Sequence, residues 1–374
     1  MANCSGLDSI RNLGEYTDRL SNATSFNDTL LMECQVPICT ALWGLGVPDL
    51  SGIGIAVGYL VSAFLGFFLP LLILAVPPRR ARLQRIFTAG LASFFDSAIY
   101  FAFAVQAATI TALAPKDWEA QTTTFGDFEV RISGLVSALC LLPLLCPIAL
   151  LPFVNTTTNN SDTKARTSYR LTLWTITVIV SFYPFVSQSI RNFAQTQAGD
   201  GKGDGGGTDI SDVDWAKVRK LCFATLSARD HRIMRAFQLL ASLSVLLFTI
   251  GALVPPGLRR LNHNFPGKSA VWEIVSTKLD AGNRIVTKHI AWLRYILIST
   301  PVLLAAPLFW GFWKLRALQK SLSMTITGYY EGDEWGFGQV MAIAIFLPVI
   351  AEMVFAWRRG RYGNDKQGES ERKR

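Results

Sequence analysis

The sequence predicts an all-α membrane protein, a bundle of about seven transmembrane helices. Half of its 374 residues are hydrophobic and only 17% are charged, whereas soluble domains usually have about 25% charged residues. Apolar segments also recur along the chain, at about 52–76, 86–113, 131–154, 171–190, 235–255, 291–313 and 337–357. Each segment is long enough to cross a hydrocarbon core of roughly 30 Å at about 1.5 Å per residue.

The charges between these segments set their expected orientation. The first connection, 77–85, contains four arginines and no acidic residue, whereas the second is acidic. By the positive-inside rule the N-terminal segment, 1–51, is then lumenal or extracellular. We expect a membrane domain over 52–357 and a basic cytosolic tail over 358–374, in the endoplasmic reticulum or another internal membrane. Topology and anionic lipid headgroups then explain the net charge of +9, so lipid is an expected partner and nucleic acid is not.

The predicted lumenal segment carries three acceptor sequences for N-glycosylation, which begin at Asn3, Asn22 and Asn27, and we expect sugar on Asn22 and Asn27, which lie close together. One or two disulfides are expected among the four cysteines on this side of the membrane, with their pairing left open. These four cysteines are Cys4, Cys34, Cys39 and Cys222. Cys140 and Cys146 fall inside the third apolar segment, where we expect buried thiols that pack as small apolar groups.

The first apolar segment begins after a turn at Pro48. Asp49 or Ser51 can cap the helix that follows, because the first backbone amides of a helix lack partners. Gly54 and Gly58 are four residues apart and so remove side chains from one face of that helix. We expect a second helix to approach closely along this face.

Two carboxyl groups stand out because a charge inside an apolar segment is costly without a partner or a function. Asp96 lies about 16 Å along the second segment from Arg85, near the middle of the membrane. Glu352 lies closer to the cytosolic end of the last segment. A buried carboxyl without a nearby cation stays protonated and could act as an acid. The alternatives are an interhelical hydrogen bond for Asp96, and a salt bridge to Arg294 or Arg358 for Glu352.

Aromatic side chains lie next to Asp96 in the sequence and in other apolar segments. The face of an aromatic ring stabilises a cation, which a cyclising carbocation needs in a dry pocket. The alternative for each ring is packing against lipid or other helices. The candidate substrate-binding residues are Phe94, Phe95, Tyr100, Phe101, Tyr183 and Trp310.

A resemblance rests on three runs, Ile38-Cys39-Thr-Ala-Leu-Trp43-Gly, Pro48-Asp49-Leu-Ser51-Gly52-Ile-Gly54 and Gly58-Tyr59. This stretch resembles fungal multi-pass membrane proteins, among them the integral-membrane terpene cyclases of meroterpenoid pathways, of the ascochlorin and ascofuranone kind. The resemblance implies an enzyme that protonates the terminal epoxide or olefin of a farnesylated aromatic precursor and cyclises the chain without a metal or other cofactor. We expect Asp96 to be the acid and Glu352 a second acid or proton acceptor, and we keep Asp49 as a further catalytic candidate.

Two other classes share the predicted architecture. A seven-helix receptor would also have an outer glycosylated N-terminus, but Leu151-Pro152-Phe153-Val154 stands where receptors carry Asp-Arg-Tyr. A transporter would explain acids inside the membrane, although no internal repeat is visible. The acidic stretch 331–334 is interpreted as a solvated loop.

Overall fold

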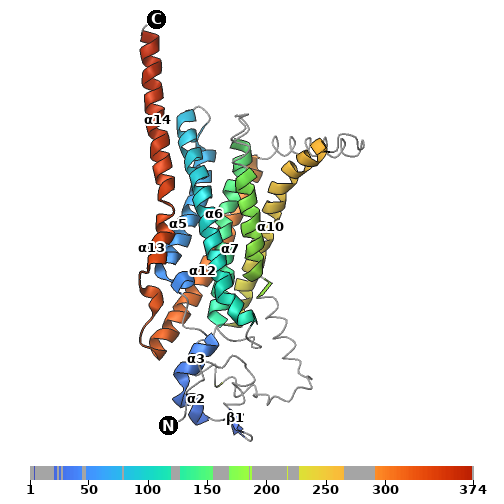
Figure 1. Ribbon diagram of the computed structural model, residues 1–374, viewed down its shortest axis with the longest axis vertical. Coiled ribbons are helices and arrows are strands. Elements are labelled where there is room, and N and C mark those ends of the chain that lie inside the picture. The colour runs from blue at the N-terminus through green and yellow to red at the C-terminus, as the bar shows by residue number, and fades with distance from the viewer. Residues whose placement is uncertain are drawn as a thin grey trace.

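A computed structural model describes residues 4, 21–22, 25–26, 28–43, 48–77, 80–118, 127–154, 168–184, 186–187, 217, 227–264 and 291–372. These residues are helical except for short connections and one antiparallel hairpin, β1 (Ser21–Asn22) with β2 (Ser25–Phe26). The helices are α2 (Asp28–Glu33), α3 (Gln35–Trp43), α4 (Pro48–Ser51), α5 (Ile53–Ala75), α6 (Ala81–Trp118), α7 (Asp127–Val154), a helix over 168–184, α10 (Ala228–Asn264), α12 (Ala291–Ile326), the 3-10 helix η3 (Glu331–Asp333), α13 (Phe337–Ala344) and α14 (Leu347–Arg372). In Figure 1 the long helices stand side by side, with α2 and α3 at one end and α14 projecting beyond the other.

Five of the described helical stretches are long and apolar enough to cross a membrane. They are Pro48–Ala75, Arg82–Ala114, Phe128–Ile148, Arg229–Gly251 and Glu331–Arg359. The all-α fold class is therefore confirmed, whereas the count of seven spans stays a prediction. The two predicted segments outside this set are helical too. The described stretch 168–184 has fewer than the roughly 20 residues that a span needs. Helix α12 carries Lys314, Arg316 and Lys320 in its second half.

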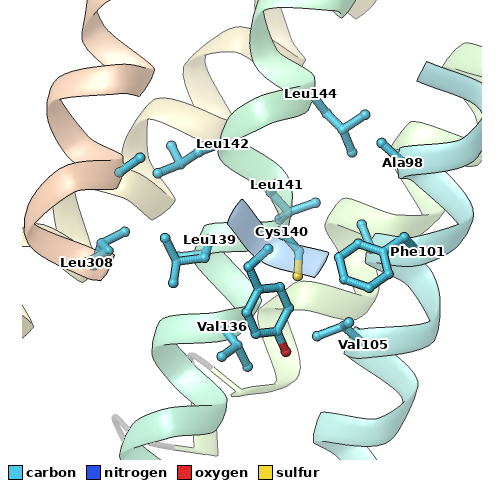
Figure 2. Close-up of a cluster of buried hydrophobic side chains, with 14 of the residues drawn as sticks. Ala98, Phe101, Val105, Val136, Leu139, Cys140, Leu141, Leu142, Leu144 and Leu308 are labelled. Carbon is cyan, nitrogen blue, oxygen red and sulfur yellow. The ribbon is translucent and has the colours of Figure 1, made fainter. Parts of the chain in front are cut away.

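Helix α7 forms the centre of the bundle. In the most apolar stretch of the candidate span Phe128–Ile148, 94% of the residues are buried, compared with 17% in that of Glu331–Arg359 at the periphery. Figure 2 shows side chains of α7, among them Leu139 and Cys140, between Phe101 of α6 and Leu308 of α12. Cys140 and Cys146 are both buried thiols that form no disulfide, as the sequence predicts.

The helix boundaries follow from proline and glycine. Helix α5 ends at Ala75 because Val76 precedes Pro77, and a residue before proline is disfavoured in the helical conformation. Val76 accordingly has φ −75° and ψ 119°. Helix α12 ends at Ile326, and Gly328 follows with φ +71°, a conformation that glycine adopts without steric cost.

The predicted last span over 337–357 is not one continuous helix. It is divided at Ile345 and Phe346 into α13 and α14. Pro348 explains the interruption, because it has no amide hydrogen for a helical bond to the carbonyl of Ala344 and its ring clashes with that carbonyl in a continuous helix. Proline is tolerated in the first turn of a helix, which is where Pro348 lies in α14. Helix α14 then continues to Arg372, so the basic tail is helical over 358–372.

The glycines of α5 face another helix, as predicted, and this helix is α13. A Cβ atom on Gly54 would lie 2.4 Å from the Cβ of Gln339, and one on Gly58 would lie 3.2 Å from the carbonyl oxygen of Ala342. Gly54 N–H donates a hydrogen bond of 2.9 Å to Oε1 of Gln339. The absence of two side chains therefore lets α13 rest directly on the start of α5.

The predicted cap of α5 is wrong. Its N-cap residue is Gly52, which makes no side-chain capping bond. Asp49 instead lies in the first turn of the preceding helix α4, where a negative charge is favourable. The carbonyl oxygen of Ser51 accepts a hydrogen bond from Arg316.

Disulfides are present in the N-terminal part, as predicted. Cys4 is bonded to Cys34, with 5.5 Å between their Cα atoms, and Cys39 is also disulfide-bonded. Asn22 lies in β1, whereas Asn27 falls outside the described residues.

Candidate functional site

Asp96 does not stand alone within α6. Nε of Arg170 donates to Oδ1 of Asp96 at 2.7 Å, and Nη2 donates to Oδ2 at 2.6 Å. Arg170 also donates to the carbonyl oxygen of Ala92 at 3.4 Å. Both carboxylate oxygens accept hydrogen bonds in this two-pronged pair, so neither is placed to hand a proton to a substrate. The expectation of a carboxyl without a nearby cation is therefore wrong for Asp96.

Two tyrosines extend this ion pair into a cluster of four polar side chains, the Asp96 cluster: Asp96, Tyr100, Tyr169 and Arg170. The hydroxyl groups of Tyr100 and Tyr169 are hydrogen-bonded to each other. Tyr100 follows Asp96 by one helical turn on α6, and Tyr169 precedes Arg170 on the 168–184 helix. The side chain of Asp96 is 47% exposed, and Tyr100 and Tyr169 are 50% and 53% exposed. The cluster thus opens onto the outside of the bundle within the candidate span Arg82–Ala114.

Three of the predicted substrate-binding rings pack in the core. Phe94 and Phe95 are completely buried, and Phe101 is 4% exposed. The ring of Phe346, between α13 and α14, lies 6.0 Å from Phe94 and 5.6 Å from Phe101. Phe101 in turn contacts Tyr59 of α5 at 5.7 Å. The packing alternative therefore describes these three rings.

The other two aromatic candidates lie elsewhere. Trp310 is 43% exposed on α12, and Nζ of Lys314 lies 5.1 Å from its ring centroid. Lys314 also forms an ion pair with Asp230, so Trp310 belongs to the contact between α12 and α10. Tyr183 is partly buried near the end of the 168–184 helix.

Glu352 lies on a different side of α6 from Asp96. It is exposed on α14, and within the described residues it makes no ion pair with Arg358. The side chain of Arg294, the other predicted partner, falls outside the described part. Helix α14 rests on the face of α6 that holds Gly90, whose added Cβ would lie 2.6 Å from Met353. At 100° per residue Asp96 points roughly 240° around from Gly90, so the two carboxyls do not share a site.

Asp49 is exposed in α4, and an added Cβ on Gly338 would lie 3.4 Å from its Oδ1 atom. It therefore lies at the α2–α3 end of the bundle beside the start of α13. This is the end opposite the connection between α5 and α6 (Figure 1). The three predicted catalytic carboxyls are thus in three separate places.

A buried arginine that the sequence reasoning missed organises the end of the bundle near Asp49. Arg316 is 7% exposed, and its Nε donates to the carbonyl oxygen of Ser51 at 2.9 Å. Its Nη2 donates to the carbonyl oxygen of Gly332 at 3.1 Å and to Oδ1 of Asp333 at 2.7 Å. Lys320 pairs with the other oxygen of Asp333 at 2.6 Å. Residues 331–333 are thus held on α4 and α12. Glu331, Asp333 and Glu334 are exposed, as expected of a solvated segment, but the segment is a 3-10 helix fixed by Arg316.

Two rings enclose the Arg316 guanidinium, those of Trp313 at 5.5 Å and Tyr330 at 5.6 Å. The hydroxyl of Tyr330 donates to Oε1 of Gln319, and burial raises the pKa of this hydroxyl. Every Arg316 bond goes to the protein's own groups. The arrangement is therefore a structural clamp between α4, α12 and η3. Its signal in the sequence is an arginine inside a mainly apolar helix, followed by an acidic turn.

A small cavity lies between α7, the 168–184 helix and α10. Its volume is about 30 Å³, which is the space of about one water molecule. Its polar lining comes from Ser137, Ser181, Gln238 and Ser242. None of the predicted site residues lines it, and a prenylated aromatic molecule does not fit into it. The described residues also hold no group of three or more potential metal ligands.

Comparison of the chain with protein-family models, curated proteins and solved structures gives no match. The class that the structure defines is therefore an all-helical protein with five candidate membrane spans. Its most distinctive polar feature outside the clamp is the Asp96 cluster, which is exposed on the side of a candidate span.

Proposed function

We propose that the protein is a membrane-embedded terpene cyclase of the fungal meroterpenoid type, which acts at the Asp96 cluster on a prenylated aromatic precursor. The observation that carries this proposal is the outward exposure of an ion pair and two phenols within the span Arg82–Ala114. Ionisable groups at this depth are costly and commonly mark a substrate site. The resemblance of the stretch 38–59 supplies the enzyme class.

Access to the cluster fits a greasy substrate. A farnesylated aromatic molecule partitions into the bilayer, and a cluster on the side of the bundle is reached from there without passing through water. About half of each tyrosine ring is exposed at this surface. The substrate would lie along α6 and the 168–184 helix, with its reactive end at the two phenols.

The hydrogen bonds suggest how the reaction would be divided among these residues. Both oxygens of Asp96 are engaged by Arg170, so the initiating donor in this proposal is the hydroxyl pair of Tyr100 and Tyr169 rather than Asp96. Phenols are weak acids, which favours an epoxide oxygen over an olefin as the group that receives the proton. The epoxide C–O bond breaks to give a hydroxyl group, and the carbocation forms carbon–carbon bonds as it cyclises.

Asp96 would stabilise the positive charge that develops on the substrate during cyclisation. Its carboxylate stabilises the carbocation electrostatically. The phenolate that the first step leaves in the tyrosine pair takes back the proton that the final cation loses. The product is an isomer of the substrate, so no metal, redox cofactor or co-reactant is consumed. Arg170 is a positioning residue, because it holds the carboxylate through two hydrogen bonds.

The test is expression in a host supplied with a farnesylated aromatic epoxide, followed by mass spectrometry and chromatography of the products. We expect a cyclic isomer from the wild type and a loss of about 100-fold or more in turnover for Asp96→Asn and for Tyr100→Phe. Tyr329→Phe is the matched control, because Tyr329 is a phenol exposed to a similar degree, 46%, in the connection between α12 and η3. Near wild-type turnover in both cluster variants, with the protein folded, would remove the cluster from the mechanism.

A transporter is the second candidate, and one observation favours it. The last candidate span is discontinuous at Ile345 and Phe346, and broken helices commonly form substrate sites in transporters. Purified protein in liposomes separates the two functions. A transporter moves an unchanged solute across the bilayer, whereas the cyclase converts an epoxide that is already dissolved in the bilayer. No observation in the described residues favours a receptor.

We also propose the seven-span topology, with the N-terminal segment in the lumen of the endoplasmic reticulum and the C-terminal tail in the cytosol. The disulfide between Cys4 and Cys34 supports this orientation, because disulfides form in oxidising compartments. A second support is the contact between Arg82 and Trp357, which brings the arginine-rich first connection and the basic tail to the same end.

A further inference from the structure

Five arginines from two distant parts of the sequence meet at the end of the bundle opposite α2 and α3. Nη2 of Arg82, at the start of α6, donates a hydrogen bond of 3.1 Å to the carbonyl oxygen of Trp357 in α14, although 275 residues separate them. This bond brings two groups of arginines together. They are Arg80, Arg82 and Arg85 near the start of α6, and Arg358 and Arg359 in α14.

The five side chains carry positive charge and have no acidic partner in the part of the chain that the structure describes. All five are exposed, and none forms an ion pair within the described residues. The contacts that they do make are to uncharged groups: Arg82 to a carbonyl oxygen, and Arg359 to the ring of Phe355 at 5.1 Å. Five like charges on one surface repel one another, so an anion that approaches them gains from all five.

Exposed apolar side chains lie next to these arginines in α14. Val354, Phe355 and Trp357 are 44%, 58% and 42% exposed on α14, just before Arg358. The candidate span Arg82–Ala114 begins at these arginines, and the candidate span Glu331–Arg359 ends at them. An exposed tryptophan beside arginines at the end of a span is typical of the boundary between hydrocarbon and headgroups.

We propose that the five arginines bind the phosphate headgroup of an anionic phospholipid, with its acyl chains against Val354, Phe355 and Trp357. Charge complementarity selects a phosphate, and the adjoining apolar side chains select a lipid over free phosphate or a nucleic acid, neither of which has acyl chains. Each arginine at a membrane surface contributes roughly fivefold to such an affinity. The proposal does not depend on the cyclase chemistry, since the Asp96 cluster lies about 21 Å further along α6 from Arg82.

The experiment measures lipid binding by the full chain in detergent micelles. Fluorescent phosphatidic acid is the probe, and unlabelled phosphatidic acid, phosphatidylcholine and inorganic phosphate are the competitors. The test variant is Arg85→Gln with Arg358→Gln, two arginines that make no hydrogen bond or ion pair within the described residues. The matched control is Arg229→Gln, an exposed arginine at the start of α10, at the opposite end of the bundle (Figure 1).

We expect phosphatidic acid to compete well, phosphatidylcholine and inorganic phosphate to compete poorly, and binding to weaken as salt is added. The double variant should bind the probe about 25-fold more weakly, as two fivefold losses multiply, while the control binds like the wild type. Thermal unfolding of each variant in the same detergent checks that it is folded. Equal binding by a folded double variant, or equal competition by inorganic phosphate, would overturn the proposal.

Discussion

Replacing Gly54 by alanine is the most direct test of how α13 is seated on α5. The added Cβ would lie 2.4 Å from the Cβ of Gln339 and 3.0 Å from the ring of Trp335. A Cβ atom is fixed to the backbone, so α13 would have to move by about 1 Å to restore ordinary contact. Overpacking of this kind costs roughly 1–3 kcal/mol.

The same movement strains the hydrogen bond from Gly54 N–H to Gln339, which is worth about 1 kcal/mol. The intrinsic preference of alanine for helices offsets up to about 1 kcal/mol. We therefore expect Gly54→Ala to lower the free energy of unfolding by about 1–3 kcal/mol. The measurement is thermal unfolding in detergent at a fixed heating rate, because unfolding of such proteins is often irreversible.

Gly251→Ala is the matched control. Gly251 lies inside α10, and an added Cβ there would meet nothing within 4 Å. Only the helix preference acts at this position, so we expect unchanged or slightly higher stability, by up to about 1 kcal/mol. If Gly54→Ala unfolds at the same temperature as Gly251→Ala, α13 does not rest on Gly54 as described.

Three further predictions concern the α2–α3 end of the bundle. Arg316→Gln removes a buried cation with three hydrogen-bond partners, and unfolding in detergent should show a loss of about 3 kcal/mol or more; wild-type stability would contradict the clamp. Cys34→Ser opens the bond to Cys4 and should cost about 2–4 kcal/mol, whereas an unchanged unfolding temperature under non-reducing conditions would exclude a structural disulfide. Under the proposed topology, glycosidase should increase the electrophoretic mobility of the expressed protein, and Asn22→Gln with Asn27→Gln should abolish most of that shift. A shift that survives in this double variant would place the sugar elsewhere.

The close approach of a second helix to Gly54 and Gly58 could be predicted from sequence, because its signal is local. Gly54 and Gly58 are one helical turn apart, and their lack of side chains has a direct geometric effect on any neighbouring helix. The identity of that neighbour was beyond sequence reasoning. Gln339 lies 285 residues after Gly54, and nothing in the neighbourhood of Gln339 or Ala342 marks them as partners of the glycines.

The partner of Asp96 could not be predicted for a related reason. Arg170 lies 74 residues from Asp96, just before the apolar segment predicted at 171–190. Hydropathy alone places such an arginine at the edge of the membrane. The guanidinium is carried on a long flexible stem, however, and can reach from the start of one helix to a carboxylate well inside another.

The clamp at Arg316 was missed because hydropathy treats each helix separately. Lys314, Arg316 and Lys320 mark the polar half of α12, which suggests solvent beyond the end of a span. In the structure the carbonyl oxygen of Ser51 and the carboxylate of Asp333 take the place of water around Arg316. Satisfaction of a charge on α12 by groups from α4 and η3 depends on tertiary structure, which one sequence does not reveal.

The contact between Gly54 and Gln339 spans 285 residues, and this separation has a consequence for synthesis of the protein. Translation at about 5–20 residues per second makes Gln339 roughly 15 to 60 seconds after Gly54. For most of that interval α5 is complete and outside the ribosome while its glycine face still lacks α13. Nascent chains that stop before residue 337 should therefore remain sensitive to proteases or dependent on insertion factors, and resistance should appear only once α13 has been made.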